Sequence, residues 1–347
     1  MTLRTLPDLA AAGLLPDAEM SALAPVAERY AVAITPHVAG LIDRADPADP
    51  IARQFVPTPA ELDLRPEELD DPIGDHAHSA VEGVVHRYPD RVLLKLLHAC
   101  PVYCRFCFRR EMVGPGGAQI LAPEALDRAL AYIRAHEEIF EVILTGGDPL
   151  ALAPRRLGEV LAALSEIPHV ATVRIHTRVP VVDPARVDPD LLAALARFDG
   201  AVWVAIHANH PRELAPEARA ALARLARAGH PLVSQTVLLA GVNDDPAVLA
   251  ELMRAFVANR VKPYYLHHPD LAPGTGHFRV PLARGREIVR ALAGRLSGLA
   301  QPTYVLDIPG GHGKARVAAP EIGAAADGSW TVEDFRGVRH TYRDSAG

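Results

Sequence analysis

The sequence predicts an α/β fold in which crossover helices cover a parallel sheet. From Arg91 onward, short apolar runs alternate six times with segments whose apolar residues recur at helical spacing. Such alternation favours parallel strands, because each helix returns the chain to the edge where the previous strand began. The pattern fits either a doubly wound sheet or a sheet curled into a barrel.

Six apolar runs are expected to form the strands. In chain order they are RVLLKLLHA, IFEVILTG, VATVRIHT, AVWVAIHA, PLVSQTVLLAG and KPYYLHH. The first connecting helix, PEALDRALAYIRAH, places four apolar residues on one face, namely Leu126, Ala129, Leu130 and Ile133. The second does the same with Leu157, Val160, Leu161 and Leu164. Further helices are expected near residues 190–198, before Gly229 and over about 245–258.

Three regions are expected along the chain. Residues 1–86 are helical and loop-rich and end in the acidic, proline-containing stretch PTPAELDLRPEELDDPIGD, which is typical of an accessory region packed on another domain. Residues 87–270 carry the strand and helix alternation, and residues 271–347 form a C-terminal segment.

The amino-acid composition is typical of a globular protein that binds neither nucleic acids nor membranes. The chain has 347 residues, 49% of them hydrophobic, and a formal net charge of −6, which is typical of a globular protein without the basic surface that binds nucleic acids or anionic membranes. The N-terminal stretch does not resemble a secretory signal, and no apolar run approaches the ~18 residues of a membrane span. We therefore expect a cytoplasmic protein with no nucleic-acid or membrane partner.

Polar residues follow each of the six predicted strands. The carboxyl ends of parallel strands share one edge of the sheet, where ligands and catalytic groups gather. A single histidine in such a position more often has a structural role, but six strand ends in succession indicate a common site. The residues concerned are Cys100 to Cys107, Gly146, Gly147, Asp148, His176, Arg178, His207, Asn209, His210, Gln235, His267, His268 and Asp270.

All three cysteines of the chain lie in the stretch CPVYCRFC, with the spacing C-x3-C-x2-C. An odd number of cysteines in a reducing compartment favours metal binding over a disulfide. A structural zinc would need a fourth ligand such as His98. An iron–sulfur cluster held by three thiolates would instead keep one iron open for a substrate or cosubstrate.

These residues carry a resemblance to a known family. The C-x3-C-x2-C loop after the first strand, with GGDPL after the second, resembles the radical S-adenosylmethionine (SAM) superfamily, and within it the lysine 2,3-aminomutase family. The similar stretches lie in the same order over about residues 54–343. They are HRYPDRVLLKLLHACPVYCRFCFRR, ILTGGDPL, IPHVATVRIHTRVPVV, QTVLLAGVND, YYLHHPDLAPGTGHFRVP and YVLDIPGGHGKARV.

The resemblance implies a partial (β/α)6 TIM-like barrel of the radical SAM type, with an N-terminal helical extension and a C-terminal segment that carries a lysine for pyridoxal 5'-phosphate (PLP). It implies a [4Fe-4S] cluster on Cys100, Cys104 and Cys107, with SAM bound to the open iron. The resemblance also implies that Gly146, Gly147 and Asp148 lie beside the SAM amino group. It further implies cofactor-binding roles for His207 and Gln235. An electron donor such as flavodoxin or ferredoxin is also implied.

The motif GGHGK, which ends at Lys314, has two possible interpretations. A nucleotide-binding P-loop requires G-x4-G-K-[ST], but Ile308 and Ala315 occupy the positions of the first glycine and the hydroxyl residue. On residue type alone, Lys314 fits an ordinary surface loop. The family resemblance instead implies that Lys314 forms a Schiff base with PLP, while Arg87 and Arg91 bind the PLP phosphate or form structural salt bridges.

Three residues are implied to select the substrate. Arg109 matches the family arginine that holds the substrate carboxylate, a role that suits its bidentate fork. Asp270 and Asp307 match the two family aspartates that hold the ε-ammonium of lysine. The implied reaction is an isomerisation in which reductive cleavage of SAM generates a radical that shifts the amino group of L-lysine from C2 to C3.

The chain departs from the longer family members in two places. Asp245 follows GVND where they carry a cysteine, and the chain ends in HTYRDSAG where they carry a cysteine-rich tail. We therefore expect a short form without the intersubunit zinc site, with a homodimer as the candidate assembly. Ala240 stands where lysine mutases often have arginine.

Alternatives stay open at this stage. The same radical chemistry could act on arginine, ornithine or glutamate, or could supply β-lysine for modification of elongation factor P, as short family members do. A non-enzymatic iron–sulfur or zinc binding module is the alternative from another class, although such a module would need neither Lys314 nor the pair of aspartates.

Overall fold

The computed structural model describes residues 1–114, 120–318, 322–324, 329–334 and 336–343, and its centre is a ten-stranded sheet. The strands lie side by side in chain order from β1 to β10. They are β1 (Ser79–Val81), β2 (Val84–Tyr88), β3 (Arg91–Leu97), β4 (Glu141–Gly146), β5 (Thr172–Thr177), β6 (Ala201–His207), β7 (Leu232–Val237), β8 (Val261–His267), β9 (Thr303–Asp307) and β10 (Lys314–Arg316).

The strand order decides between the two predicted architectures. Each strand from β3 to β8 pairs in parallel with the next one along the chain, whereas a doubly wound sheet reverses its order at a switch point. An order that never reverses curls the sheet in one direction, as in a TIM barrel. The predicted partial barrel and its six strands, β3 to β8, are therefore confirmed.

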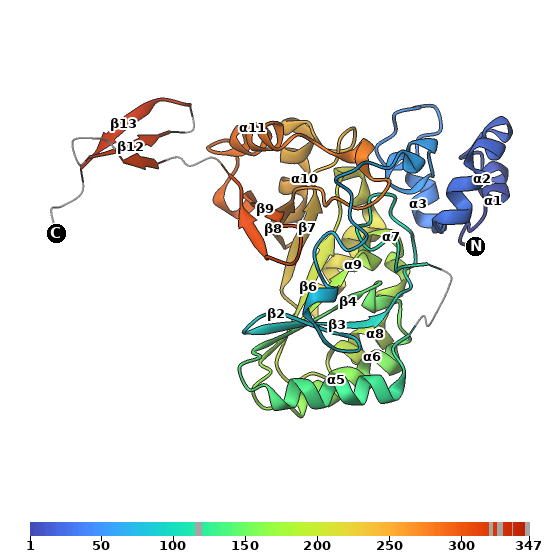
Figure 1. Ribbon diagram of the computed structural model, residues 1–347, viewed down its shortest axis with the longest axis vertical. Helices are drawn as coiled ribbons and strands as arrows, with labels where there is room; N and C mark the ends of the chain where they lie inside the picture. Colours follow the sequence, from blue (N-terminus) through green and yellow to red (C-terminus); the bar gives the residue numbers. More distant parts are fainter. Residues whose placement is uncertain (115–119, 319–321, 325–328, 335, 344–347) are drawn as a thin grey trace.

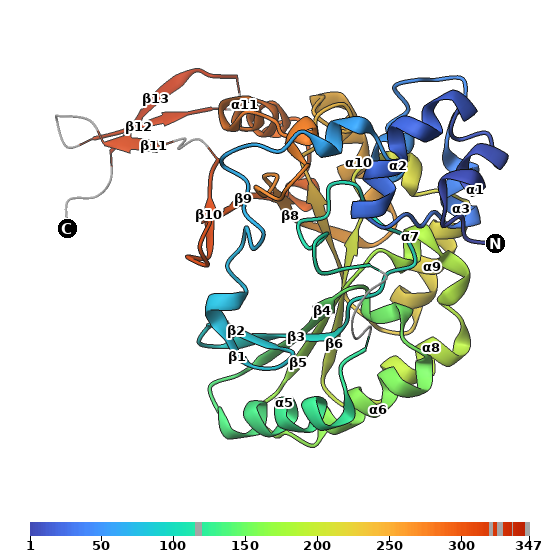
Figure 2. The same cartoon turned by 45° about the vertical axis from the view of Figure 1, so that its right-hand side comes forward.

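Helices cover the convex side of the sheet (Figure 2). Five of them begin with a proline, which suits the first turn because it has no N–H to leave unpaired. The apolar faces predicted for the first two are buried. The helices are α5 (Pro123–Ala135), α6 (Pro154–Ser165), α7 (Val179–Val182), α8 (Pro189–Leu195), α9 (Pro216–Arg227), α10 (Pro246–Ala258) and α11 (Leu282–Leu292).

Asp245, the residue that replaces a cysteine of longer family members, caps helix α10. Its carboxylate accepts hydrogen bonds from the backbone N–H groups of Ala247 at 2.6 Å and Val248 at 3.3 Å. Residues 344–347 of the ending HTYRDSAG lie outside the described residues. Among the described residues, no helix combines the length and apolar character needed to span a membrane.

The N-terminal region packs beside α7 and α9 as short helices and loops (Figure 1). Leu9, Leu23, Val26 and Phe55 belong to the same apolar core as the barrel strands. The proposed division at residue 86 stays a prediction. The helices are α1 (Leu6–Ala11), α2 (Met20–Arg29), α3 (Pro36–Leu41) and α4 (Ala52–Phe55), and two 3-10 turns matter below, η2 (Pro59–Leu62) and η3 (His76–His78).

The C-terminal segment contributes to the barrel, which the sequence did not indicate. Strand β9 continues the parallel sheet beyond β8, and β10 folds back antiparallel to β9. A separate antiparallel sheet then projects from the body of the molecule (Figure 1). Its strands are β11 (Ile322–Ala324), β12 (Trp330–Glu333) and β13 (Arg339–Tyr342).

Side-chain hydrogen bonds, rather than strand pairing, connect the β2 edge of the sheet to the segment that joins β9 and β10. The Tyr88 hydroxyl accepts a hydrogen bond from the backbone N–H of Lys314 at 2.9 Å, and His78 Nε2 lies 3.0 Å from the carbonyl oxygen of Gly311. A Cβ atom on Gly74 would lie 2.3 Å from the backbone nitrogen of Gly311, and both glycines have positive φ. Only glycine allows this approach.

Candidate active site

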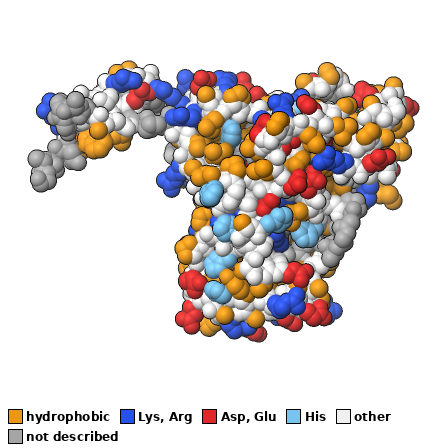
Figure 3. Space-filling view, viewed as in Figure 1, with side chains coloured by type: hydrophobic (Ala, Val, Ile, Leu, Met, Phe, Trp, Pro, Cys, Tyr) orange, Lys and Arg blue, Asp and Glu red, His pale blue; other side chains and the backbone are white. Residues whose placement is uncertain are grey.

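A cavity of about 270 Å³ opens at the carboxyl ends of the barrel strands. Several histidine side chains are visible on the face drawn in Figure 3. Every residue with a metal, cofactor or substrate role assigned from the sequence lines this cavity, so the fold brings together positions from Arg87 to Lys314. Asn209, His210 and His268, which were expected at the same edge of the sheet, do not line it. The assigned residues are Arg87, Arg91, Cys100, Cys104, Cys107, Arg109, Gly146, Gly147, Asp148, His207, Gln235, Asp270, Asp307 and Lys314.

Two buried arginines fix the loop that carries the cysteines. The Arg105 guanidinium donates to Glu61 of η2 at 2.5–3.0 Å, and Arg110 pairs with the same carboxylate. Glu61 is 0% exposed. A buried carboxylate that pairs with two guanidinium groups lowers the cost of burying them, so this group of ion pairs anchors the cysteine loop to the N-terminal region.

The arrangement of the three thiols is compatible with an iron–sulfur cluster. Burial raises the pKa of Cys100 well above its ordinary value and that of Cys107 to about 11, so binding as thiolates requires a strongly cationic partner such as iron. Among the described residues, no three side chains of His, Cys, Asp or Glu are arranged to hold one metal ion. Thiolates that bind a cluster each contact a different iron, so they need no such convergence.

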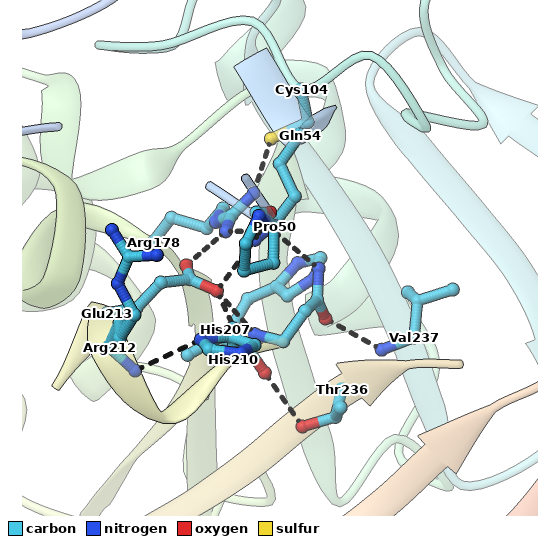
Figure 4. Close-up of polar contacts among 12 residues, drawn as sticks. Pro50, Gln54, Cys104, Arg178, His207, His210, Arg212, Glu213, Thr236 and Val237 are labelled. Carbon is cyan, nitrogen blue, oxygen red and sulfur yellow. Dashed lines mark hydrogen bonds and ion pairs between the residues drawn. The ribbon is translucent and has the colours of Figure 1, made fainter. Parts of the chain in front are cut away.

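A polar network extends from Cys104 into the N-terminal region (Figure 4). Arg178 donates to the Cys104 sulfur at 2.9 Å and to the Gln54 Oε1 at 3.1 Å, and it pairs with Glu213. Glu213 also accepts the backbone N–H groups of Asn209 and His210, at 2.8 and 2.9 Å. Buried networks of this kind fix side-chain positions when their members are satisfied. Gln54 and Glu213 thereby hold Arg178 against the cysteine loop.

The GGD loop packs tightly against the backbone that leads to the cysteines. A Cβ on Gly147 would lie 2.2 Å from the carbonyl oxygen of Ala99, so this position requires glycine. The Asp148 carboxylate accepts four hydrogen bonds, from Thr177 Oγ1 at 2.7 Å and from the N–H groups of Leu150, Arg178 and Val179 at 2.7–3.2 Å. Burial raises the pKa of Asp148, and these bonds oppose that rise. Its carboxylate therefore joins the ends of two strands.

Charged groups from β8, β9 and β10 meet on the opposite side of the cavity. The Lys314 amine lies 2.5 Å from Asp307 Oδ1, and His267 Nδ1 lies 3.5 Å from Asp307 Oδ2. Burial, together with the neighbouring Asp307 charge, raises the pKa of Asp270 to about 7. Although burial acts to raise it, the pKa of Asp307 falls below its ordinary value because His267 and Lys314 donate to it. The two carboxylates thus differ in protonation near pH 7.

Arginines gather around a buried carboxylate that the sequence analysis did not identify. Asp75 pairs with Arg87 at 3.1 Å and with Arg109 at 2.9 Å. Arg91 takes a different position, paired with the adjacent Asp90 and stacked 3.8 Å from the centre of the Tyr88 ring. The cavity thus has a cationic side around Asp75 and an acidic pair at Asp270 and Asp307.

Burial favours the neutral form of two histidines in the cavity. Burial lowers the pKa of His176 and His207 well below the ordinary value. His176 Nε2 lies 3.2 Å from Gln235 Nε2, and His207 Nε2 lies 3.2 Å from Asn209 Oδ1. Neutral imidazoles can donate or accept a hydrogen bond without adding charge to the cavity.

Comparisons with known proteins support the same class. Residues 94–253 match the Radical SAM superfamily. The chain is 42% identical over 313 residues to L-lysine 2,3-aminomutase of Clostridium subterminale, covering 90% of this chain and 75% of that protein. It is 41% identical over 308 residues to a putative L-lysine 2,3-aminomutase of Aquifex aeolicus, covering 89% and 83%.

More distant relatives extend the comparison. Glutamate 2,3-aminomutase of Clostridioides difficile is 38% identical over 289 residues, which cover 83% of this chain and 68% of that protein. A solved radical SAM methyltransferase from Sphaerobacter thermophilus aligns over 64% of this chain and 68% of its own, with 22% identity and a TM-score of 0.43. The identities of about 40% over most of the length are decisive, and the chain belongs to the lysine 2,3-aminomutase family of radical SAM isomerases.

Proposed function

We propose that the protein is a PLP-dependent amino-acid 2,3-aminomutase that converts L-lysine to β-lysine. One observation carries the proposal: a single cavity places Arg109 among its lining residues together with the carboxylates of Asp270 and Asp307. A free amino acid with a cationic side chain presents the complementary charges, an α-carboxylate and a distal ammonium. The family likeness supplies the reaction type.

The residues present fit the cofactors of this family. Cys100, Cys104 and Cys107 would hold a [4Fe-4S] cluster, and the adjoining GGD loop, with His207 and Gln235, would border SAM. Lys314 would hold PLP through its amine, with Arg87 and Arg91 at the phosphate. When bound, the cluster, SAM and PLP supply the radical chemistry that moves an amino group between adjacent carbons.

The side chains of this protein orient the substrate and select it. Arg109 would bind the α-carboxylate with its guanidinium fork. Asp270 and Asp307 would accept hydrogen bonds from the side-chain ammonium, and each charged bond contributes roughly 1.5–3 kcal/mol. Glutamate would bring a third carboxylate to this acidic pair, so repulsion disfavours it. Lysine is therefore proposed ahead of glutamate, although a relative is named for glutamate.

Two accompanying proposals do not rest on the geometry of the cavity. A one-electron donor of the flavodoxin or ferredoxin type would reduce the cluster, and the enzyme would work in the cytoplasm.

The test is anaerobic reconstitution with iron, sulfide and PLP, followed by incubation with SAM, a strong reductant and L-lysine. Chromatography should show β-lysine, and parallel incubations with ornithine, arginine and glutamate should show less product. A fully loaded protein that isomerises one of those amino acids in preference to lysine would overturn the substrate assignment. A protein that isomerises none of the four would overturn the proposed function.

A further inference from the structure

Asp75 contacts two arginines that the proposed function assigns to two different anions. Its Oδ1 accepts a hydrogen bond from Arg87 Nη2 at 3.1 Å. Its Oδ2 accepts two from Arg109, from Nη2 at 2.9 Å and from Nε at 3.3 Å. The carboxylate is 2% exposed. Both arginines line the cavity, whereas Asp75 lies behind them.

The charges around Asp75 do not balance. The carboxylate faces two guanidinium groups, and the buried Lys95 adds a third positive charge close enough to act on the pKa of Asp75. Asp71 adds a second negative charge, which acts on the pKa of Lys95, so the cations outnumber the carboxylates by one. Although burial acts to raise the pKa of Asp75, Arg109 and the other cations hold it below its ordinary value, so Asp75 is ionised at neutral pH. Buried cations in excess of their carboxylates favour the entry of anions.

Donor atoms remain for such anions. Within the described residues, the buried Nε of Arg87 has no hydrogen-bond partner. Arg109 Nη1 has only a long contact of 3.4 Å to the Thr145 hydroxyl. An arginine carries five N–H donors, and buried donors normally find acceptors. Each guanidinium therefore keeps capacity for an oxygen atom of a ligand after its bonds to Asp75 are counted.

The position of Asp75 is itself fixed. Its backbone N–H donates to Asp71 Oδ1 at 2.9 Å, and its carbonyl oxygen accepts from the Ser79 hydroxyl at 3.2 Å. The neighbouring Gly74 and His78 pack on the loop that leads to Lys314, through Gly311. A rigid carboxylate at this place fixes both guanidinium groups relative to the lysine segment.

We propose that Asp75 is a positioning residue that holds Arg87 to bind the phosphate of PLP and Arg109 to bind the α-carboxylate of the amino acid. The inference rests on the proposed function, which supplies the two anions. A free arginine side chain would lose rotamer entropy each time it bound an anion. Because Asp75 already orders both arginine side chains when the protein folds, this entropy loss does not occur again on binding. Each anion therefore binds more tightly.

The test compares ligands that differ only in the anionic group, using cluster-loaded protein. Affinity for PLP is measured against pyridoxal, which lacks the phosphate, from the absorbance of the bound cofactor. Affinity of the PLP-loaded protein for L-lysine is measured against cadaverine, which lacks the carboxylate. Asp75→Asn keeps the side-chain size and removes the charge. Because Asp75 acts by positioning the two arginines, both preference ratios should fall at least tenfold. A rise in both ratios would show that Asp75 only competes with the ligand anions and would overturn the inference. Equal losses for both members of each pair would show a merely structural role and overturn the inference.

Controls separate this effect from loss of folding. Asp49 is a buried carboxylate that pairs with Arg212 and lies outside the cavity lining, so Asp49→Asn should leave both ratios unchanged. Asp75→Glu keeps the charge but moves it by one methylene group, and it should give intermediate preference ratios. If Asp75→Asn does not fold, this variant tests the positioning role instead. Adding Asp75→Asn to Arg109→Gln should lower the lysine preference no further. Additive losses would contradict action through Arg109.

These outcomes are independent of the test of the proposed function. Product analysis of the unaltered protein with lysine decides whether the reaction and substrate are correct. The preference ratios report anion recognition in the absence of turnover. A protein that binds PLP and lysine with unaltered ratios in Asp75→Asn would overturn the role of Asp75 while leaving the proposed reaction intact.

Discussion

The amine of Lys314 lies 2.5 Å from Asp307 Oδ1, so two residues assigned to different ligands contact each other in the free protein. Strands β9 and β10 place them directly opposite in antiparallel register. Lys314 therefore occupies the carboxylate that the substrate ammonium would use. Engagement of the lysine amine by PLP would release Asp307, which predicts that PLP binds before the amino acid.

Asp307→Asn should weaken lysine binding without removing PLP. The amide loses a charged hydrogen bond of roughly 1.5–3 kcal/mol, so the kcat/KM for lysine should fall at least tenfold. PLP content, measured by absorbance after gel filtration, should stay near one per chain because Lys314 is retained. Norleucine, which lacks the ammonium, is the matched ligand and should bind equally well to both proteins. Loss of PLP from this variant would contradict the assignment.

Lys314→Ala and Cys104→Ala should separate the two cofactors. Lys314 lies partly exposed on the edge strand β10, and Asp307 keeps His267 as a partner, so the protein should tolerate the alanine. This variant should lose the PLP absorbance and keep its iron. Cys104→Ala should lose iron and keep PLP. Iron assays and absorbance spectra check both, and loss of both cofactors from either variant would refute the separation of roles.

The barrel and the set of cavity residues could be predicted because their signals are local. Strand and helix periodicity identified β3 to β8, and parallel strands bring their carboxyl ends to one edge. Strand β9 was missed because the short stretch YVLD was interpreted for its aspartate alone. Its pairing with β8 depends on the fold of the intervening segment, which periodicity does not report.

The partners of buried charges could not be predicted. Asp75 stands in the acidic stretch LDDPIGD, where nothing local distinguishes one aspartate from another. Its importance arises only when the fold brings it to Arg109, 34 residues away. Asp148 was assigned beside SAM, and its four hydrogen bonds within the protein come from residues that follow two different strands. Whether the Asp148 carboxylate finds hydrogen-bond donors depends on the folded structure and cannot be predicted from the local sequence.

Glu61→Gln should destabilise the protein and impair cluster loading. Removing the charge leaves the guanidinium groups of Arg105 and Arg110 buried without a counterion, which typically costs about 3–5 kcal/mol. The melting temperature should fall by at least about 5 °C. Iron content should fall with it, because this cluster anchors the cysteine loop. An unchanged melting temperature would contradict the anchoring role.

The difference in stability between the wild-type protein and Glu61→Gln should depend on pH. Burial acts to raise the pKa of Glu61, but Arg105 and Arg110 hold it below the ordinary value of 4.5. A carboxylate with a lowered folded pKa stabilises the protein above its unfolded pKa and loses that contribution as the pH falls through the folded value. The stability difference between wild type and Glu61→Gln should therefore stay constant above about pH 5 and narrow below 4.5. Denaturant titrations at several pH values measure it.

Recognition of lysine should strengthen as the pH rises toward 7. Burial and the neighbouring Asp307 raise the pKa of Asp270 to about 7, so the carboxyl is mostly protonated in the free protein below that pH. A substrate ammonium binds the ionised form, and below pH 7 its binding must displace a proton. The affinity ratio of lysine to norleucine should therefore rise up to about tenfold per pH unit below 7 and level off above it.

Asp270→Asn identifies the group responsible for this pH dependence. The amide does not titrate in this range, so the ratio of lysine to norleucine affinity should become flat between pH 5 and 8, at about a tenth or less of the wild-type value at pH 8. Absorbance titrations of the PLP-loaded protein supply both affinities. A variant that keeps the wild-type slope would show that another group titrates. A flat ratio in the wild-type protein would show that Asp270 is ionised throughout and that the acidic pair carries its full charge without the substrate.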